Sequence, residues 1–301
     1  MTYDASYHRS ERLRVMARWS EVGVLESRGR LPVEQAFVER VEQAASPFFR
    51  PVPVNDLDSV EFHRALSYLL DAFDSLPWRV DVAFDSTWKA FELATTRLTT
   101  GNVTDRLRSA ATGLDPDVLE RLCASLPVQS CEYLFKRLVT DAVSGHEDQR
   151  LGNRVRGLND QAILSLISHL NSAYADGSST SRRKGALLIR RALRGEVLRL
   201  GPVADFQLGI ESRARVLISL FLYTSRNERF HGASFSPFVS SAASLSTYTH
   251  PFFAFLASYY LLLCTWSRTL EGVFPESEGL LVSFDANLKL AIGVFGRHWE
   301  R

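Results

Sequence analysis

Apolar side chains recur every three or four residues along most of the chain, which is the spacing of one buried helical face. Such stripes cover residues 33–44, 62–73, 80–98, 131–142, 163–170, 214–221 and 284–292. Alternating runs separated by Asn-Gly or Asp-Gly, the usual signal of a β-hairpin, are not found. The pattern therefore predicts an all-α protein.

Breaks in the pattern predict how these helices are organised. Pro32 stands at a suitable first helical position, and Ser46 to Pro53 separates the N-terminal helices from the rest. We therefore expect an N-terminal helical segment over residues 1–55 and a main helical domain over residues 56–301.

Three polar stretches predict connections between helices. Gly145–Gly157 and Asp176–Ser181 are expected to be polar loops. The Ser/Thr-rich stretch Ser234–Thr249 predicts a longer connection, and two readings of it stay open: a lid over a functional site, or disorder.

The most apolar segment is Phe252–Trp266. It is shorter than the roughly 20 apolar residues that a membrane-spanning helix needs. We therefore expect a buried or interface helix and no association with a membrane.

Composition narrows the class of protein. Hydrophobic residues make up 46% of the chain and charged residues 23%, and the net charge is +1, so no overall field draws the protein to nucleic acid. The three cysteines (Cys123, Cys131 and Cys264) are too widely spaced for a zinc site, and their number fits a reducing compartment. The N-terminus lacks an apolar signal core. We expect a cytoplasmic protein with no metal site and no cofactor.

One group of residues could take part in a chemical reaction. A helix is expected from about Glu211 to Gly232, and Arg226, Asn227 and His231 then lie on one face of its last turns, with Arg229 close by. A fixed cation, an amide and a proton carrier are the groups that phosphodiester chemistry needs. The alternative is an ordinary helix end, where basic residues and histidine are favoured by the helix dipole.

The stretch Leu222–Gly232 (LYTSRNERFHG) resembles the signature of the HEPN superfamily, an apolar helix that runs into Arg-Asn and ends in His-Gly. In that family a long apolar helix follows the motif, as Pro251–Trp266 does here, and an earlier helix similar to Trp78–Leu98 packs on it. Residues before 56 and from about 101 to 200 have no counterpart. The resemblance implies an all-α, HEPN-like helical bundle with inserted helices and an N-terminal helical extension.

The resemblance also implies an activity. Many HEPN proteins are metal-independent endoribonucleases, in which a ribose 2′-OH attacks the adjacent phosphate of RNA. In that reaction His231 would carry the proton, Arg226 would stabilise the charge on phosphorus, and Asn227 would orient one of them. Arg229 is a candidate for binding the substrate.

A homodimer is expected as well, because one Arg-His pair supplies a single proton carrier and the family pairs two such helices. We expect the Phe252–Trp266 helix or its neighbours at the interface, with plain core as the alternative. The family further implies a place in antiviral or stress responses and a protein regulator or antitoxin as a partner. Toxin members paired with nucleotidyltransferase antitoxins carry a tyrosine two residues after the histidine, whereas this chain has Ala233.

A basic stripe is expected on the helix that Ser178 opens. Arg183, Arg190 and Arg194 lie on one side of it and are candidates for tracking RNA phosphates. The alternative is a solvated surface helix. Two other functions also stay open: a non-catalytic HEPN-like scaffold that binds RNA or protein, and a helical adaptor with no nucleic-acid partner.

Overall fold

The computed structural model describes a few residues between 7 and 17 and then residues 32–44, 47–141, 149–176, 178–232, 244–275 and 279–300. Helices account for about 75% of the structure, which confirms the all-α prediction. The first helices are α3 (Pro32–Gln43), α4 (Val60–Asp74), α5 (Val80–Ala94), α6 (Val103–Thr112), α7 (Pro116–Ser125) and α8 (Val128–Phe135). The later ones are α10 (Gln149–Gly157), α11 (Gln161–Tyr174), α12 (Ser179–Leu193), α13 (Ile210–Arg215), α14 (Tyr223–Phe230), α15 (Leu245–Thr269) and α16 (Leu280–Phe295).

Shorter elements complete the described chain. Residues Thr95–Arg97 and Gly296–His298 form 3-10 turns, and Lys136–Thr140 and Val216–Leu222 are π-helical. A small antiparallel hairpin, which the sequence pattern did not predict, pairs β1 (Leu198–Leu200) with β2 (Val203–Phe206). Its tight connection depends on Gly201, whose φ of 60° lies in the left-handed region that favours glycine.

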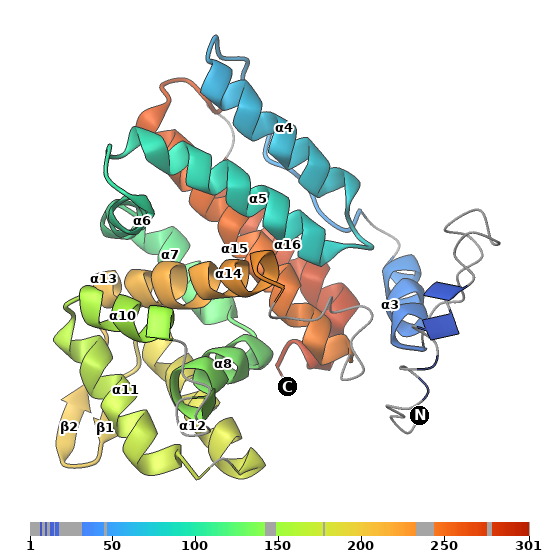
Figure 1. Cartoon of the computed structure of the whole chain (residues 1–301). Coiled ribbons are helices and arrows are strands. Elements are labelled where there is room, and N and C mark those ends of the chain that lie inside the picture. Colours follow the sequence, from blue (N-terminus) through green and yellow to red (C-terminus); the bar gives the residue numbers. More distant parts are fainter. Residues whose placement is uncertain are drawn as a thin grey trace.

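Helix α15 forms the centre of the molecule. Every residue from Pro251 to Trp266 is buried within the single chain, and α5, α8 and α16 pack around it, with α4 alongside α5 (Figure 1). The Phe252–Trp266 helix is therefore core, as the alternative had it, and cannot itself form a dimer interface; an interface through its neighbours stays a prediction. A helix that is apolar on all sides is covered on all sides.

The start of α15 also differs from expectation. The helix begins at Leu245 because Ser244 and Thr247 form a capping box that satisfies its first backbone N–H groups. Pro251 lies inside the helix rather than before it. The predicted connection Ser234–Thr249 therefore ends at Ser244, and its residues 234–243 lie outside the described part of the chain.

The core continues across the expected boundary between residues 55 and 56. The Phe37 ring of α3 packs on Tyr248 and Phe295, at centroid distances of 5.3 and 5.9 Å. The backbone N–H of Val52 donates to the Tyr259 hydroxyl at 2.7 Å. The N-terminal segment is thus attached to the two C-terminal helices.

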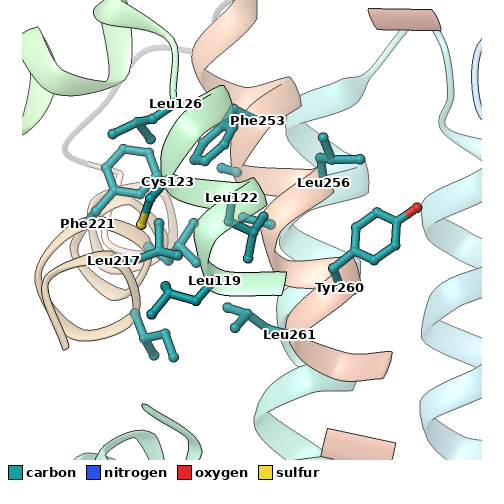
Figure 2. Packing of buried hydrophobic residues seen from close by; sticks show 14 of the residues in the cluster. Leu119, Leu122, Cys123, Leu126, Leu217, Phe221, Phe253, Leu256, Tyr260 and Leu261 are labelled. Carbon is teal, nitrogen blue, oxygen red and sulfur yellow. The ribbon is translucent and has the colours of Figure 1, made fainter. Parts of the chain in front are cut away.

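Helices from residues 101–200, the stretch without a family counterpart, are also part of the core. Figure 2 shows the α7 residues Leu119 and Leu122 between Leu217 of the π-helical segment and Leu261 of α15. These helices surround the segment that leads into the Arg-Asn motif, and so they help to position it.

Candidate active site

The motif lies at the end of a continuous helical stretch. Helix α13, the π-helical segment Val216–Leu222 and α14 follow one another without a break, and His231 caps the end. Gly232 has a φ of 67° and its N–H donates to the Arg229 carbonyl at 3.2 Å, as in a left-handed cap. The predicted helix from about Glu211 to Gly232 is confirmed.

The polar residues of α14 divide between two faces. Ser225, Glu228 and Arg229 point into the protein, where they meet α8, α15 and α5. Arg226, Asn227 and His231 line a pocket of about 500 Å³ on the other side. The full set of lining residues is Thr104, Arg108, Arg150, Asn153, Arg154, Gly157, Tyr223, Arg226, Asn227 and His231.

Arg226 is held by three neighbours. Its Nη1 donates to Asn227 Oδ1 at 3.0 Å, its Nη2 lies 3.5 Å from Glu92 Oε2, and its guanidinium lies 4.3 Å from the centroid of the Phe230 ring. Glu92 is itself fixed by the Trp88 indole, which donates to Oε2 at 2.9 Å. Among the residues that the structure describes, none accepts a hydrogen bond from the buried Nε of Arg226.

Asn227 and His231 complete the motif. The side-chain oxygen of Asn227 accepts from Arg226, which leaves its amide N–H groups as donors at the pocket. His231 is exposed to solvent. The i, i+4 spacing therefore places the amide and the imidazole on the same side, as the helical period predicts.

Arg229 does not line this pocket. Its Nε donates to Asp85 at 2.8 Å, and its Nη2 donates to Asp85 at 2.7 Å and to Asp81 at 3.1 Å. Asp81 is fully buried and also accepts from Arg79 at 3.0 Å. Burial opposes the charge of Asp81, but the hydrogen bonds from Arg79 and the charge of Arg229 outweigh it, so the pKa of Asp81 is lowered. Arg229 thus links α14 to α5.

The predicted basic stripe is not brought to the pocket either. Arg183 donates to Glu132 at 2.9 Å, Arg190 donates to the Leu126 carbonyl at 2.9 Å, and the Arg194 side chain donates to the Ala124 carbonyl at 2.9 Å. Arg190 is only 7% exposed. These contacts hold α12 against α7 and α8, and a contact of the three arginines with RNA stays a prediction.

Other basic residues take their place in the pocket. Arg150, Asn153 and Arg154 come from α10, and Arg108 comes from α6. The expectation of a polar loop over Gly145–Gly157 is wrong from Gln149 onward, because these residues form α10. The available signal was Leu151 and Val155, both buried and spaced i, i+4, with the two arginines in matching register.

A polar cluster lies behind the motif, on the face of α14 opposite to the pocket. Glu228 accepts from the Tyr133 hydroxyl at 2.8 Å and forms an ion pair with Arg137, whose Nε lies 2.6 Å from Oε1, and burial raises the pKa of Glu228. The ring of His250 packs against Tyr133 and Phe221, and its Nδ1 has no hydrogen-bond partner within the described ranges of the chain. Burial, helped by the charge of Arg229, lowers the pKa of His250 to about 3. His250 is therefore neutral at physiological pH.

Two kinds of site were sought across the described ranges. His, Cys, Asp and Glu side chains there do not gather into a group of three or more that can hold a metal ion. No helix of that part of the chain combines the length and apolar character needed to cross a bilayer.

Comparison with protein-family models, with curated proteins and with solved structures finds no match to this chain. A functional proposal therefore depends on the geometry and chemistry of the pocket.

Proposed function

We propose that this chain is a HEPN-like, metal-independent endoribonuclease. The observation that carries the proposal is that Arg226, Asn227 and His231 line one pocket, together with three further arginines. Phosphate is the ligand that several guanidinium groups recognise best. The exposed imidazole at the same pocket supplies a group that can accept and donate a proton.

The residues of the pocket match the needs of transesterification. The ribose 2′-oxygen attacks the adjacent phosphorus, its proton passes to a base, and the 5′-oxygen leaves as it takes up a proton. His231 acts as base or acid, a role worth roughly 10²–10⁴-fold in rate. Arg226 donates to the phosphorane oxygens, and one such donor is worth roughly 10²–10³-fold. The product is a 2′,3′-cyclic phosphate.

The reaction needs two proton carriers, and this leads to the proposal of a homodimer. Among the described histidines, only His231 lines the pocket. It is exposed at the end of its helix, where a second copy of the chain can approach. A twofold axis next to His231 would bring two imidazoles to one phosphate.

The test is RNA cleavage by the purified protein in EDTA. We expect cleavage, and a loss of at least about 100-fold in His231→Ala. His63→Ala is the matched control, because His63 is exposed on α4 and does not line the pocket. Cleavage that continues at the wild-type rate in His231→Ala contradicts the proposal.

A second candidate is a non-catalytic HEPN-like protein that binds RNA. The contact of Arg226 with Glu92 favours it, because a guanidinium paired with a carboxylate stabilises the charge on a reacting phosphate less well, while the other arginines of the pocket still bind RNA phosphates. Tight RNA binding without cleavage, unchanged by His231→Ala, would support this candidate.

A further inference from the structure

Three arginines outside the motif share its pocket. Arg108 comes from α6, and Arg150 and Arg154 come from α10. We propose that they form a subsite for the RNA phosphates that flank the phosphate to be cleaved. This inference rests on the proposed function, since it assigns the cleaved phosphate to Arg226 and His231.

Contacts with the motif helix fix the position of this subsite. Arg154 donates from Nη2 to the Thr224 hydroxyl at 2.7 Å, and its guanidinium lies 4.7 Å from the centroid of the Tyr223 ring. Arg108 donates to the Gly157 carbonyl at 3.2 Å, which ties α6 to the end of α10. Helix α10 is therefore attached to α14, and helix α6 is attached to α10.

Charge and size both indicate a ligand with more than one phosphate. The lining residues include four arginines and no carboxylate, although Asp105 lies 3.5 Å from Arg108 and Glu92 lies 3.5 Å from Arg226 just outside them. The guanidinium groups come from three helices, α6, α10 and α14, and guanidinium is the side-chain group that recognises phosphate best. The volume of about 500 Å³ lies within the range of roughly 300–1,000 Å³ that holds small organic ligands, and so exceeds the needs of one phosphate.

The experiment measures how RNA affinity depends on salt. The probe is a fluorescent single-stranded oligonucleotide of about 12 nucleotides with 2′-O-methyl riboses, which cannot be cleaved, titrated between about 50 and 200 mM salt. Each phosphate contact contributes about −0.7 to the slope of log affinity against log salt for a single strand. We expect Arg108→Gln/Arg150→Gln/Arg154→Gln to make the slope shallower by about 2.

Matched variants separate this subsite from general charge and from misfolding. Arg199→Gln removes one positive charge from an exposed position of β1 outside the pocket, and its slope should equal that of the wild type. Arg150→Glu tests the subsite at an exposed residue if the triple variant does not fold. It should weaken binding at least about tenfold at low salt.

A second probe, a 2′-O-methyl dinucleotide with one phosphate, distinguishes the flanking phosphates from the central one. Its affinity should be the same in the triple variant and in the wild type. An unchanged salt slope in the triple variant and unchanged binding in Arg150→Glu overturn the inference. If the slopes change as expected but His231→Ala leaves RNA cleavage unaltered, the proposed function fails while the phosphate subsite stands.

Discussion

Two histidines near the motif differ in environment, and only one of them suits proton transfer. His231 is exposed at the pocket, whereas His250 has a buried Nδ1 without a partner and packs between two aromatic rings. The two histidines differ in exposure because they lie at different places relative to the end of α14. The imidazole that follows the helix reaches solvent, and the one that belongs to α15 faces the interior.

His250 should make the protein sensitive to acid. Its pKa is lowered to about 3 in the folded chain, against an ordinary value of 6.5, so the unfolded chain binds the proton first. Stability is therefore complete above about pH 6.5 and falls as the pH drops toward 3. The slope cannot exceed about 1.4 kcal/mol per pH unit, because at this one residue the unfolded chain binds at most one proton more than the folded chain.

Urea unfolding at several pH values checks this prediction. His250→Phe should lose less stability than the wild type between about pH 6.5 and 4.5, while the exposed variant His231→Phe should follow the wild type. If His250→Phe and the wild type lose the same free energy of unfolding over this range, the assignment to His250 is wrong.

Glu92 should position Arg226 without touching the substrate. Glu92→Gln keeps an acceptor for the Trp88 indole but removes the charge next to the guanidinium. We expect kcat for RNA cleavage to fall about tenfold, which corresponds to about 1.4 kcal/mol, with little change in KM. Glu61→Gln, on the exposed face of α4, is the control. An unchanged kcat would show that Glu92 does not position Arg226.

At the scale of elements, the main connection of the motif helix to α5 is Arg229. It bridges Asp81 and Asp85, and Asp81 has no exposure of its own. Arg229→Gln should lower the free energy of unfolding by about 3 kcal/mol, because the variant leaves a buried carboxylate with one partner fewer. Chemical denaturation measures this loss.

Arg226→Gln should lose activity with a much smaller change in stability. Equal losses of unfolding free energy in the Arg229 and Arg226 variants would contradict the division between the two faces of α14.

Helices with one apolar stripe were predictable from the sequence. In α4, Phe62, Ala65 and Leu69 are buried at helical spacing, as expected. A helix over Val216–Leu222 was predicted, but its π-helical hydrogen bonding was not, because all seven of its residues are buried and no polar face marks their phase. Such segments often occur next to functional sites.

Part of the candidate site was also predictable from helical periodicity. Arg226, Asn227 and His231 share a face that follows from local helical geometry alone. The arginines of α6 and α10 come from sequence positions far from the motif, so only the packing of these helices on α14 reveals them. Arg190 is the opposite case: its charge predicted a surface position, but the fold buries it against the end of α7.

At the scale of the whole molecule, the apolar helix α15 is covered within one chain, and the motif lies at the surface. A homodimer must therefore form through surfaces other than Phe252–Trp266. If two copies of His231 share one site, an equal mixture of wild-type and His231→Ala chains, allowed to exchange partners, should keep about a quarter of the wild-type activity. Sites that work independently would keep about half of the wild-type activity.

Sedimentation at the assay concentration should give twice the mass of the chain, and a monomer that is fully active contradicts the shared site.

The central claim is that Arg226 and His231 act on one RNA phosphate. The most direct measurement is mass spectrometry of the RNA fragments that the purified protein produces in EDTA. We expect fragments ending in 2′,3′-cyclic phosphate, formed by the wild type and absent with Arg226→Ala or His231→Ala. Intact RNA after prolonged incubation with the wild-type protein, or the same cyclic ends from both variants at the wild-type rate, would contradict this proposal.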